Sequence, residues 1–174
     1  MKIIILGQPR SGKSTLAGLL SRELDIPAIC TDKYRYDWGF HEPWKGYETE
    51  IAPEKQDLFY EKIAALCADY PHFILEGNAI NPRDIERFAP DAAVLLARID
   101  ITPMECLRLC RQFDKDDWTC RRDDDYLLKL FADYTRFARK WAAENPELLI
   151  DTSDYNAGIE TAHAVILEKL NASV

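Results

Sequence analysis

The sequence predicts an α/β protein in which helices cover both faces of a parallel β-sheet, and three observations lead to this fold class. Short apolar runs alternate along the chain with longer stretches of helical periodicity, as expected of consecutive strand–helix units. The run Ala92–Arg98 is apolar up to its last residue, which is typical of a strand covered on both faces. A glycine-containing turn joins the first apolar run, Ile3–Leu6, directly to the first helical stretch.

Five short segments are expected to form the strands. They are Lys2–Leu6, Ala28–Thr31, His72–Glu76, Ala92–Arg98 and Glu147–Asp151. The first helix is expected at Ser14–Leu24, where Leu16, Leu20 and Leu24 lie on one stripe. Pro27 limits this helix because the residue before a proline avoids the α conformation.

Five further helices are expected later in the chain. They span about Pro53–Tyr70, a short stretch starting at Asn81, Thr102–Phe113, Leu127–Glu144 and Ile159–Leu170. The residues from Thr102 to Glu105 form a capping box with proline at the first helical position. The segment Asp32–Pro53 has too many glycine, proline and charged residues for a long regular element, and Asp114–Asp125 is expected to be a charged loop.

The turn after the first strand carries the motif G-x-x-x-x-G-K-[ST]. Its residues are Gly7, Gln8, Pro9, Arg10, Ser11, Gly12, Lys13, Ser14 and Thr15. In such a loop, backbone N–H groups surround a diphosphate at the positive end of the following helix. Lys13 would reach the β- and γ-phosphates, and the Ser14 hydroxyl would ligate Mg²⁺ with Thr15 beside it. The strand before the turn and the helix after it disfavour the alternative, a turn that binds nothing.

On this motif the chain resembles the P-loop NTPases. Its 174 residues narrow the resemblance to the P-loop kinases of small molecules, such as adenylate kinase, shikimate kinase, gluconate kinase and the kinase half of polynucleotide kinase. The resemblance extends over the whole chain in the order of elements. It implies a three-layer sandwich with five parallel strands in the order 2-3-1-4-5. It also implies a single domain over residues 1–174, with an acceptor-binding insertion at about 32–70 and a lid at about 108–126.

A second group of candidate residues follows the second strand. The run Thr31–Arg35 is similar to the Asp-x-x-Arg arrangement of polynucleotide kinase and related kinases. This resemblance implies that Asp32 orients or deprotonates the acceptor hydroxyl and that Arg35 contacts phosphate. A carboxylate within hydrogen-bond reach of an alcohol suits phosphoryl transfer, in which positioning supplies most of the catalysis. The alternative for Asp32 is a capping role in the next turn.

Glu76 ends the third strand, at the edge of the sheet where open parallel sheets bind ligands. A carboxylate there can hold Mg²⁺ through water or contact the substrate. The position resembles the Asp-Gly of adenylate kinase, but this chain has Glu-Gly-Asn and lacks the Phe-Pro-Arg that follows in that family. AMP is therefore not indicated as the acceptor. Arg83 could supply a phosphate contact or lie on the surface of a helix.

Arginines on both sides of the charged loop are candidates for a lid. Arg108 and Arg111 precede the loop, and Arg121 and Arg122 follow it. A mobile loop that brings guanidinium groups onto the transferring phosphoryl group neutralises charge and excludes water. We assign Arg111 and Arg122 to this role and Arg108 to the nucleotide, although the many aspartates also fit a solvated, salt-bridged surface. By resemblance, Thr152 lies where related kinases form part of the adenine pocket.

Aromatic residues are concentrated in the expected acceptor-binding region. They are Tyr34, Tyr36, Trp38, Phe40, Trp44 and Tyr47. Their rings could stack on a nucleobase or sugar, or they could form the local core of a segment without regular structure.

The composition limits the class of partner. The chain has 22 basic and 30 acidic residues and a net charge of −8, which argues against a broad nucleic-acid-binding surface. No apolar run approaches the ~18 residues of a membrane span, and the chain enters a strand at once, so we expect a cytoplasmic protein without a membrane partner. Five cysteines are expected as reduced thiols. A zinc-bearing lid with Cys106, Cys110 and Cys120 is the alternative, but no C-x-x-C pair supports it.

These features indicate an ATP- and Mg²⁺-dependent kinase of a small molecule, nucleoside or nucleotide. Two alternatives remain. The first is a polynucleotide 5′-hydroxyl kinase, which the Asp32 and Arg35 pair supports and the acidic charge opposes. The second is a nucleotide-binding switch without phosphotransfer.

Overall fold

Five parallel strands form the centre of the molecule. The computed structural model describes residues 1–40, 51, 53–77, 89, 91–97, 101–113, 122–144 and 149–172. Within them the strands are β1 (Lys2–Leu6), β2 (Ala28–Cys30), β3 (Phe73–Glu76), β4 (Ala93–Ala97) and β5 (Leu149–Ile150). They form one sheet in the order β2-β3-β1-β4-β5, and each neighbouring pair is parallel. The expected α/β class with a parallel sheet is confirmed, and the strand order is the one that the resemblance implied.

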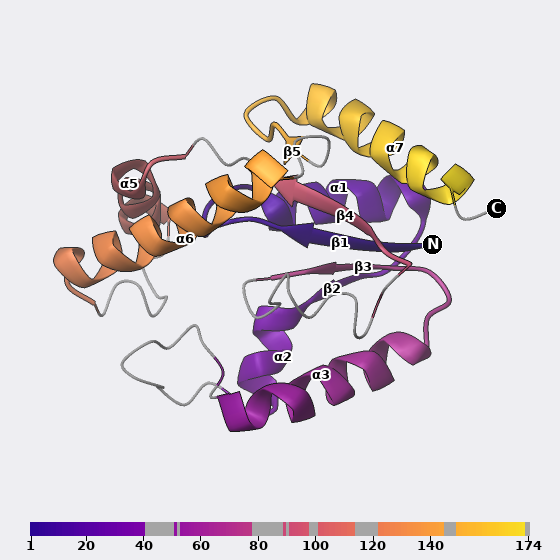
Figure 1. Ribbon diagram of the computed structural model, residues 1–174, viewed down its shortest axis with the longest axis horizontal. Coiled ribbons are helices and arrows are strands. Elements are labelled where there is room, and N and C mark those ends of the chain that lie inside the picture. Colours follow the sequence, from indigo (N-terminus) through magenta and orange to yellow (C-terminus); the bar gives the residue numbers. More distant parts are fainter. Residues whose placement is uncertain are drawn as a thin grey trace.

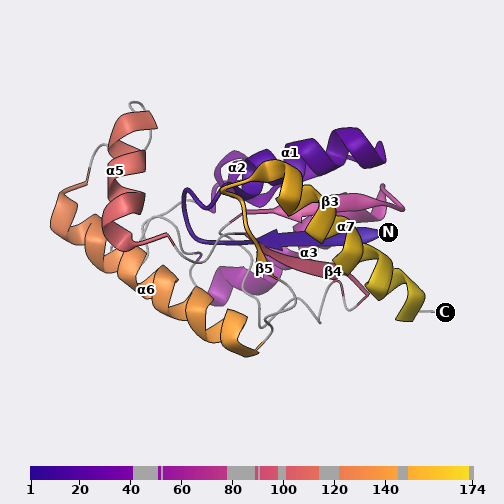
Figure 2. The same cartoon turned by 90° about the horizontal axis from the view of Figure 1, so that it is seen from above.

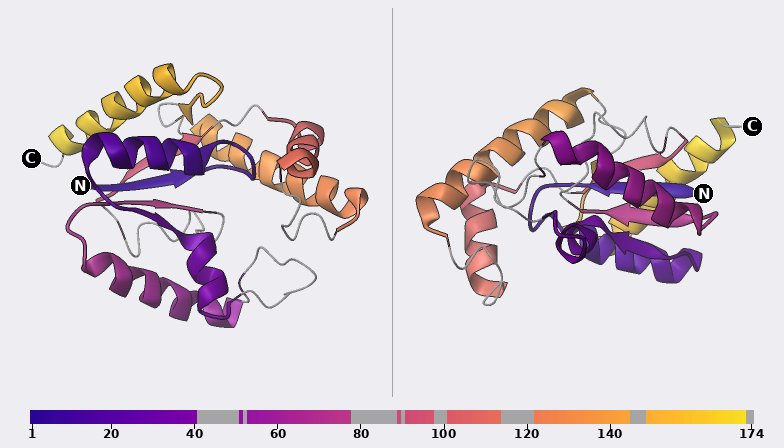
Figure 3. Two further views of the ribbon diagram at one scale, coloured as in Figure 1. Left: turned by 180° about the vertical axis from the view of Figure 1, so that it is seen from behind. Right: turned by 90° about the horizontal axis from the view of Figure 1, so that it is seen from below.

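Helices cover both faces of this sheet (Figure 1). The described helices are α1 (Lys13–Leu24), α2 (Thr31–Asp37), α3 (Pro53–Ala68), α5 (Pro103–Phe113), α6 (Asp124–Glu144) and α7 (Tyr155–Ala172). Helices α1 and α7 lie side by side on one face, and α3 covers the other (Figures 1 and 3). The helix expected from Asn81 lies outside the described residues. None of the described helices combines the length and the apolar character that a membrane span requires.

The central strand β1 divides the core into two clusters. Successive side chains of a strand point to opposite faces, so Ile3 and Ile5 pack towards α1 and α7 while Ile4 and Leu6 pack towards α3. All four side chains are 5% exposed or less. This two-sided burial explains why the strand sequence is apolar without alternation.

Helices α5 and α6 form an arm that projects beyond the carboxyl end of β1 (Figure 2). The two helices share a third apolar cluster that includes Ile101, Leu107, Leu127 and Phe131. The Thr102 hydroxyl accepts a hydrogen bond from the Glu105 backbone N–H at 3.1 Å, as the capping box predicts. The arm therefore has its own hydrophobic core and begins directly beside the phosphate loop.

The prediction that Asp32–Pro53 is irregular is wrong for its first part, because Thr31–Asp37 forms α2. The Thr31 hydroxyl donates to the Glu76 carbonyl oxygen at 3.1 Å and fixes the start of the helix against the end of β3. Tyr34 and Trp38 pack on the apolar cluster between the sheet and α3, and this packing stabilises a helix that is too short to be stable alone. Tertiary packing thus overrides the local composition.

Candidate active site

The loop between β1 and α1 has the backbone conformation of an anion-binding turn. Gly12 is the N-cap of α1 with φ of 86°, a left-handed conformation that glycine adopts without steric cost. No side chain caps this helix end, and the first turn contains no acidic residue. The first backbone N–H groups of α1 therefore present an uncompensated positive end at Lys13, which suits a phosphate group.

Buried side chains hold the phosphate loop in place. Gln8 and Ser11 are 3% and 1% exposed, and the Ser11 backbone N–H donates to the Gln8 carbonyl at 3.1 Å. The Thr152 hydroxyl donates to the Ser11 carbonyl, and the Cys106 thiol donates to the Pro9 carbonyl at 3.1 Å. Thr152 thus contacts the loop backbone itself, so in this structure its hydroxyl orients the phosphate loop.

The expected metal-binding pair is brought together. Ser14 in the first turn of α1 donates its hydroxyl to Oε2 of Glu76 at 3.0 Å. Glu76 is 4% exposed and Lys13 is 7% exposed, whereas Ser14 and Thr15 are exposed at the edge of the sheet. Two oxygen donors at this distance can enter the coordination shell of one hard cation. The hydrogen bond fixes the Glu76 carboxylate in the direction of the loop.

Asp32 lies next to this pair because β3 and α2 approach each other closely. A Cβ atom at Gly77 would lie 3.2 Å from the Asp32 backbone nitrogen and 3.3 Å from its Cγ, and it would also collide with the Thr31 hydroxyl. Only a glycine leaves room for this approach. The Asp32 carboxyl group, partly exposed, therefore stands beside the carboxyl end of β3 that carries Glu76.

Arg35 follows one turn later on α2 and is 2% exposed. Its carbonyl oxygen accepts a hydrogen bond from the Phe40 backbone N–H at 2.8 Å, which closes the end of the helix.

The aromatic rings that follow Arg35 in the chain pack on their neighbours. Trp38 lies 4.9 Å from Tyr34 and 6.2 Å from Phe59 between ring centroids. These rings belong to the apolar core between the sheet and α3. The other aromatic residues expected there, Trp44 and Tyr47, lie outside the described residues.

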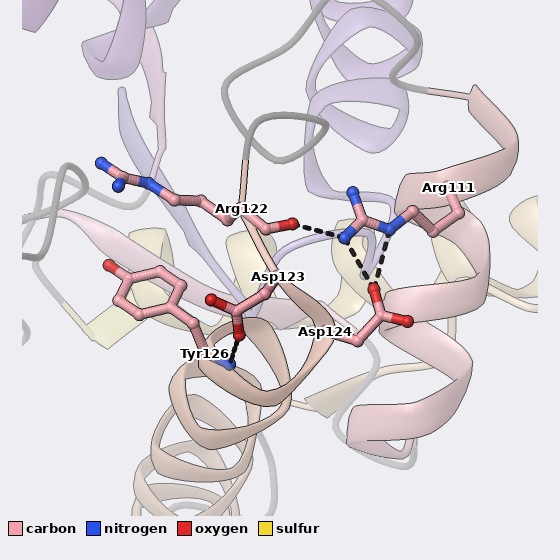
Figure 4. Close-up of polar contacts among 5 residues, drawn as sticks. All are labelled: Arg111, Arg122, Asp123, Asp124 and Tyr126. Carbon is pink, nitrogen blue, oxygen red and sulfur yellow. Dashed lines mark hydrogen bonds and ion pairs between the residues drawn. The ribbon is translucent and has the colours of Figure 1, made fainter.

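The candidate lid arginines have different surroundings on the arm. Arg111 donates to Oδ1 of Asp124 at 2.6 Å and to the Arg122 carbonyl at 2.6 Å, which ties the end of α5 to the start of α6 (Figure 4). The Arg122 guanidinium points away from Arg111 and lies 5.5 Å from the Tyr126 ring. Arg108 is exposed and donates to Gln112. Arg121, and likewise Arg83, lies outside the described residues.

The thiols of Cys30 on β2 and Cys106 on α5 lie beside the candidate site. Cys30 is the register partner of Glu76 on the neighbouring strand, and burial together with a hydrogen bond to Glu76 raises the pKa of Cys30 to about 12. A hydrogen bond with Cys110, together with burial, raises the pKa of the Cys106 thiol far above its usual range. Both thiols therefore stay protonated at neutral pH. Cys106 and Cys110 are each 1% exposed, and Cys120 lies outside the described residues.

Comparison with known proteins identifies the fold. No family model matches the sequence, and no curated protein is detectably similar to it in sequence. A gluconokinase structure from Sinorhizobium meliloti 1021 matches with a TM-score of 0.60 and 14% identity over 96% of this chain and 91% of that chain. A shikimate kinase structure from Aquifex aeolicus vf5 matches with a TM-score of 0.60 and 22% identity over 99% and 98%. The chain has the fold of the P-loop kinases.

A further similar structure is a deoxyadenosine kinase from M. mycoides, with a TM-score of 0.55 and 15% identity over 99% of this chain and 100% of that chain. The P-loop kinase fold thus accounts for nearly the full length of this chain and of all three similar structures. The loop at Gly7–Thr15 follows β1, Asp32 follows β2 and Glu76 is the last residue of β3, so all three lie at the same edge of the sheet.

Some residues at this site were not indicated by the sequence. Thr135 and Ile101 hold the loop through hydrogen bonds to Gln8, which lies 127 and 93 positions away. Each is an ordinary residue in its local pattern.

Proposed function

We propose that this chain is an ATP-dependent phosphotransferase that moves the γ-phosphoryl group of ATP to a hydroxyl or phosphate of a small molecule, nucleoside or nucleotide. The observation that carries this proposal is the contact of Ser14 with Glu76 beside the uncapped N-terminus of α1. The kinases of similar fold support the reaction class. Their named substrates differ from one another, so they do not identify the acceptor.

In this proposal the nucleotide polyphosphate lies against the backbone N–H groups of Gly7–Thr15. Lys13 offsets the charge of the β- and γ-phosphates, and its burial excludes water from that contact. Thr152 keeps the loop in place through the Ser11 carbonyl, with the base of the nucleotide nearby. Arg108, on the exposed side of α5, would contact the nucleotide after the arm closes.

The residues at the edge of the sheet fit a magnesium ion. The Ser14 hydroxyl and the Glu76 carboxylate are hard oxygen donors that already lie 3.0 Å apart. They would hold the ion directly or through water. Bound there, Mg²⁺ would neutralise charge on the β- and γ-phosphates.

Asp32 is the proposed general base. The acceptor oxygen attacks the γ-phosphorus, the bond between the γ-phosphorus and the bridging oxygen of ADP breaks, and Asp32 takes the proton from the acceptor hydroxyl. Arg35 would contact an anionic group beside the transferred phosphate. Residues 32–70 would hold the acceptor, and residues 108–126 would act as the lid of this single domain.

Arg111 and Arg122 would stabilise the charge that spreads over the transferring group. In the present arrangement Arg111 is bonded to Asp124, a partner that is 63% exposed in its side chain. Such an exposed pair is weak, on the order of 1 kcal/mol or less, so a phosphate group can replace the carboxylate. To reach the transferring group, the Arg122 side chain has to move away from the Tyr126 ring.

The first test measures ADP release from Mg-ATP with a panel of sugars, shikimate-like acids, nucleosides and nucleotides, and an oligonucleotide with a free 5′-hydroxyl. We expect turnover with at least one acceptor. Lys13→Ala should lower kcat/KM by about 10² or more. Asp32→Asn should lower kcat by about 10²–10⁴, because it removes the base and preserves the shape of the side chain.

Matched controls lie outside the proposed site. Lys129→Ala and Asp133→Asn change exposed residues of α6. Both controls should retain activity within about twofold. Equal rates for Lys13→Ala, Asp32→Asn and the unmodified chain would contradict the proposal. Tight binding of ATP without turnover on any acceptor would favour the nucleotide-binding switch.

A further inference from the structure

The side chain of Gln8 joins the phosphate loop to both helices of the arm. Its Nε2 donates to the Ile101 carbonyl at 2.7 Å, directly before α5. Its Oε1 accepts a hydrogen bond from the Thr135 hydroxyl at 2.8 Å, in the middle of α6. Gln8 is 3% exposed and Thr135 is 5% exposed, so both bonds are shielded from water.

This arrangement is costly to break. A buried amide that loses one of its partners keeps an unsatisfied polar atom, and the cost of that is larger than the net gain of an average hydrogen bond. The Oε1 oxygen and one of the two N–H groups of Nε2 are engaged with the arm, so the Gln8 side chain is held in one orientation.

A second contact lies on the neighbouring residue of the loop. The Cys106 thiol on α5 donates to the Pro9 carbonyl at 3.1 Å. Two consecutive loop residues are thus bonded to the arm at Ile101, Cys106 and Thr135. The same arm carries the candidate phosphate-contacting residues Arg108, Arg111 and Arg122.

We propose that Gln8 is a positioning residue that, together with Thr135, couples the occupancy of the phosphate loop to the order of the α5–α6 arm. This inference rests on the proposed nucleotide site. A polyphosphate that fixes the loop backbone also fixes the Gln8 side chain, and the two buried bonds carry that restraint to α5 and α6. The arginines of the arm then take up their positions relative to the phosphates only when the loop is occupied.

The coupling makes a specific kinetic prediction. Without the hydrogen bond from Thr135, the loop still binds nucleotide through its own backbone and Lys13. The position of the arm relative to the loop, however, is no longer fixed. The variant Thr135→Val should therefore change KM for ATP by less than about threefold and lower kcat by about tenfold. A smaller folded fraction would also lower the apparent kcat at unchanged KM, so kcat is normalised to the folded fraction of each variant.

Hydrogen exchange tests the inference without a known acceptor. The probe is Mg-ATP at saturating concentration, and the amide exchange of α1 and of α6 is compared with and without it. In the unmodified chain we expect slower exchange in both helices on addition of Mg-ATP. In Thr135→Val the protection of α1 should remain, and that of α6 should fall at least several-fold.

Two variants serve as controls. Thr135→Ser keeps the hydroxyl and should restore the protection of α6. Thr161→Val makes the same change in α7, where the hydroxyl donates only to the Ala157 carbonyl of its own helix, and it should leave the protection of α6 unchanged.

The outcomes separate this inference from the proposed function. Protection of α6 by Mg-ATP that persists in Thr135→Val overturns the coupling. Protection of α1 alone in the unmodified chain also overturns the coupling and leaves the nucleotide site intact. Absence of protection in both helices removes the nucleotide site, and the coupling falls with it.

Discussion

At the scale of single residues, Gly77 determines how closely β3 and α2 approach. Its φ is 137°, a conformation that residues with a side chain rarely adopt, and the space for a Cβ atom is taken by Thr31 and by the backbone of Asp32. A methyl group there would push the start of α2 away from the end of β3. Asp32 and Glu76 would then separate, although neither residue has been changed.

We therefore expect Gly77→Ala to destabilise the protein by about 3 kcal/mol or more, as the sum of backbone strain and steric overlap. Gly39→Ala is the matched control, because Gly39 also has a positive φ, 75°, but has no atom within 4 Å of the added Cβ. It should cost about 1 kcal/mol from strain alone. Urea denaturation of both variants measures the difference, and equal losses of stability would show that the close approach is unimportant.

The residues of the site differ in how far the sequence reveals them. Gly7–Thr15 form a contiguous motif whose spacing reflects the geometry of phosphate binding, and the loop has the expected position between β1 and α1. Asp32 and Glu76 could be placed at the same edge by their positions after strands. The bond from Thr135 to Gln8 joins residues 127 positions apart, and no local pattern encodes such a contact.

At the scale of elements, the α5–α6 arm is held together by apolar contacts more than by its ion pair. Leu127 is fully buried between the two helices, whereas Arg111 and Asp124 are 33% and 63% exposed in their side chains. Exposed ion pairs contribute little because water and salt screen them. The interface of the arm therefore depends on its small hydrophobic core.

The variant Leu127→Ala should lower the free energy of unfolding by about 2–5 kcal/mol, because it leaves a cavity in that core. Asp124→Asn should change it by about 1 kcal/mol or less, and the change should shrink further in high salt. Leu167→Ala on α7 makes the same truncation at a side chain that is 58% exposed, and it should cost about 0.5 kcal/mol or less. A larger loss for Asp124→Asn than for Leu127→Ala would contradict this account.

Element boundaries were predicted best where a local signal marks them. The expected helix over Thr102–Phe113 agrees with α5, because a capping box and a proline define its start. Helix α2 was missed because its seven residues are mostly polar and their stability comes from packing of Tyr34 and Trp38 on the core. Helix propensity alone cannot reveal an element that tertiary contacts stabilise.

At the scale of the whole molecule, alternation of strands and helices was sufficient to predict the fold class. The buried side chains of β1 on both faces explain that success, since a strand in the middle of a covered sheet must be apolar throughout. The register between strands was not predictable. Ile4, for example, pairs with Leu75 on one side and Val94 on the other, and these partners are equally apolar.

The net charge of −8 also acts on the whole molecule. A broad nucleic-acid-binding surface needs several cationic side chains that neutralise phosphates and release counterions. We therefore expect no salt-sensitive binding of a single-stranded oligonucleotide at low ionic strength, measured by fluorescence anisotropy. Binding that weakens steeply with salt would instead favour the polynucleotide kinase alternative, with a local basic groove.

The N-terminus and the last turn of α7 lie at the side of the molecule opposite the α5–α6 arm (Figure 2). Residue Met1 is separated from the phosphate loop by the length of β1, roughly 16 Å for five extended residues. An affinity tag or a tether attached at either terminus therefore leaves the entrance to the loop open to solution. The chain can be immobilised on a sensor surface by these ends without blocking access for small molecules.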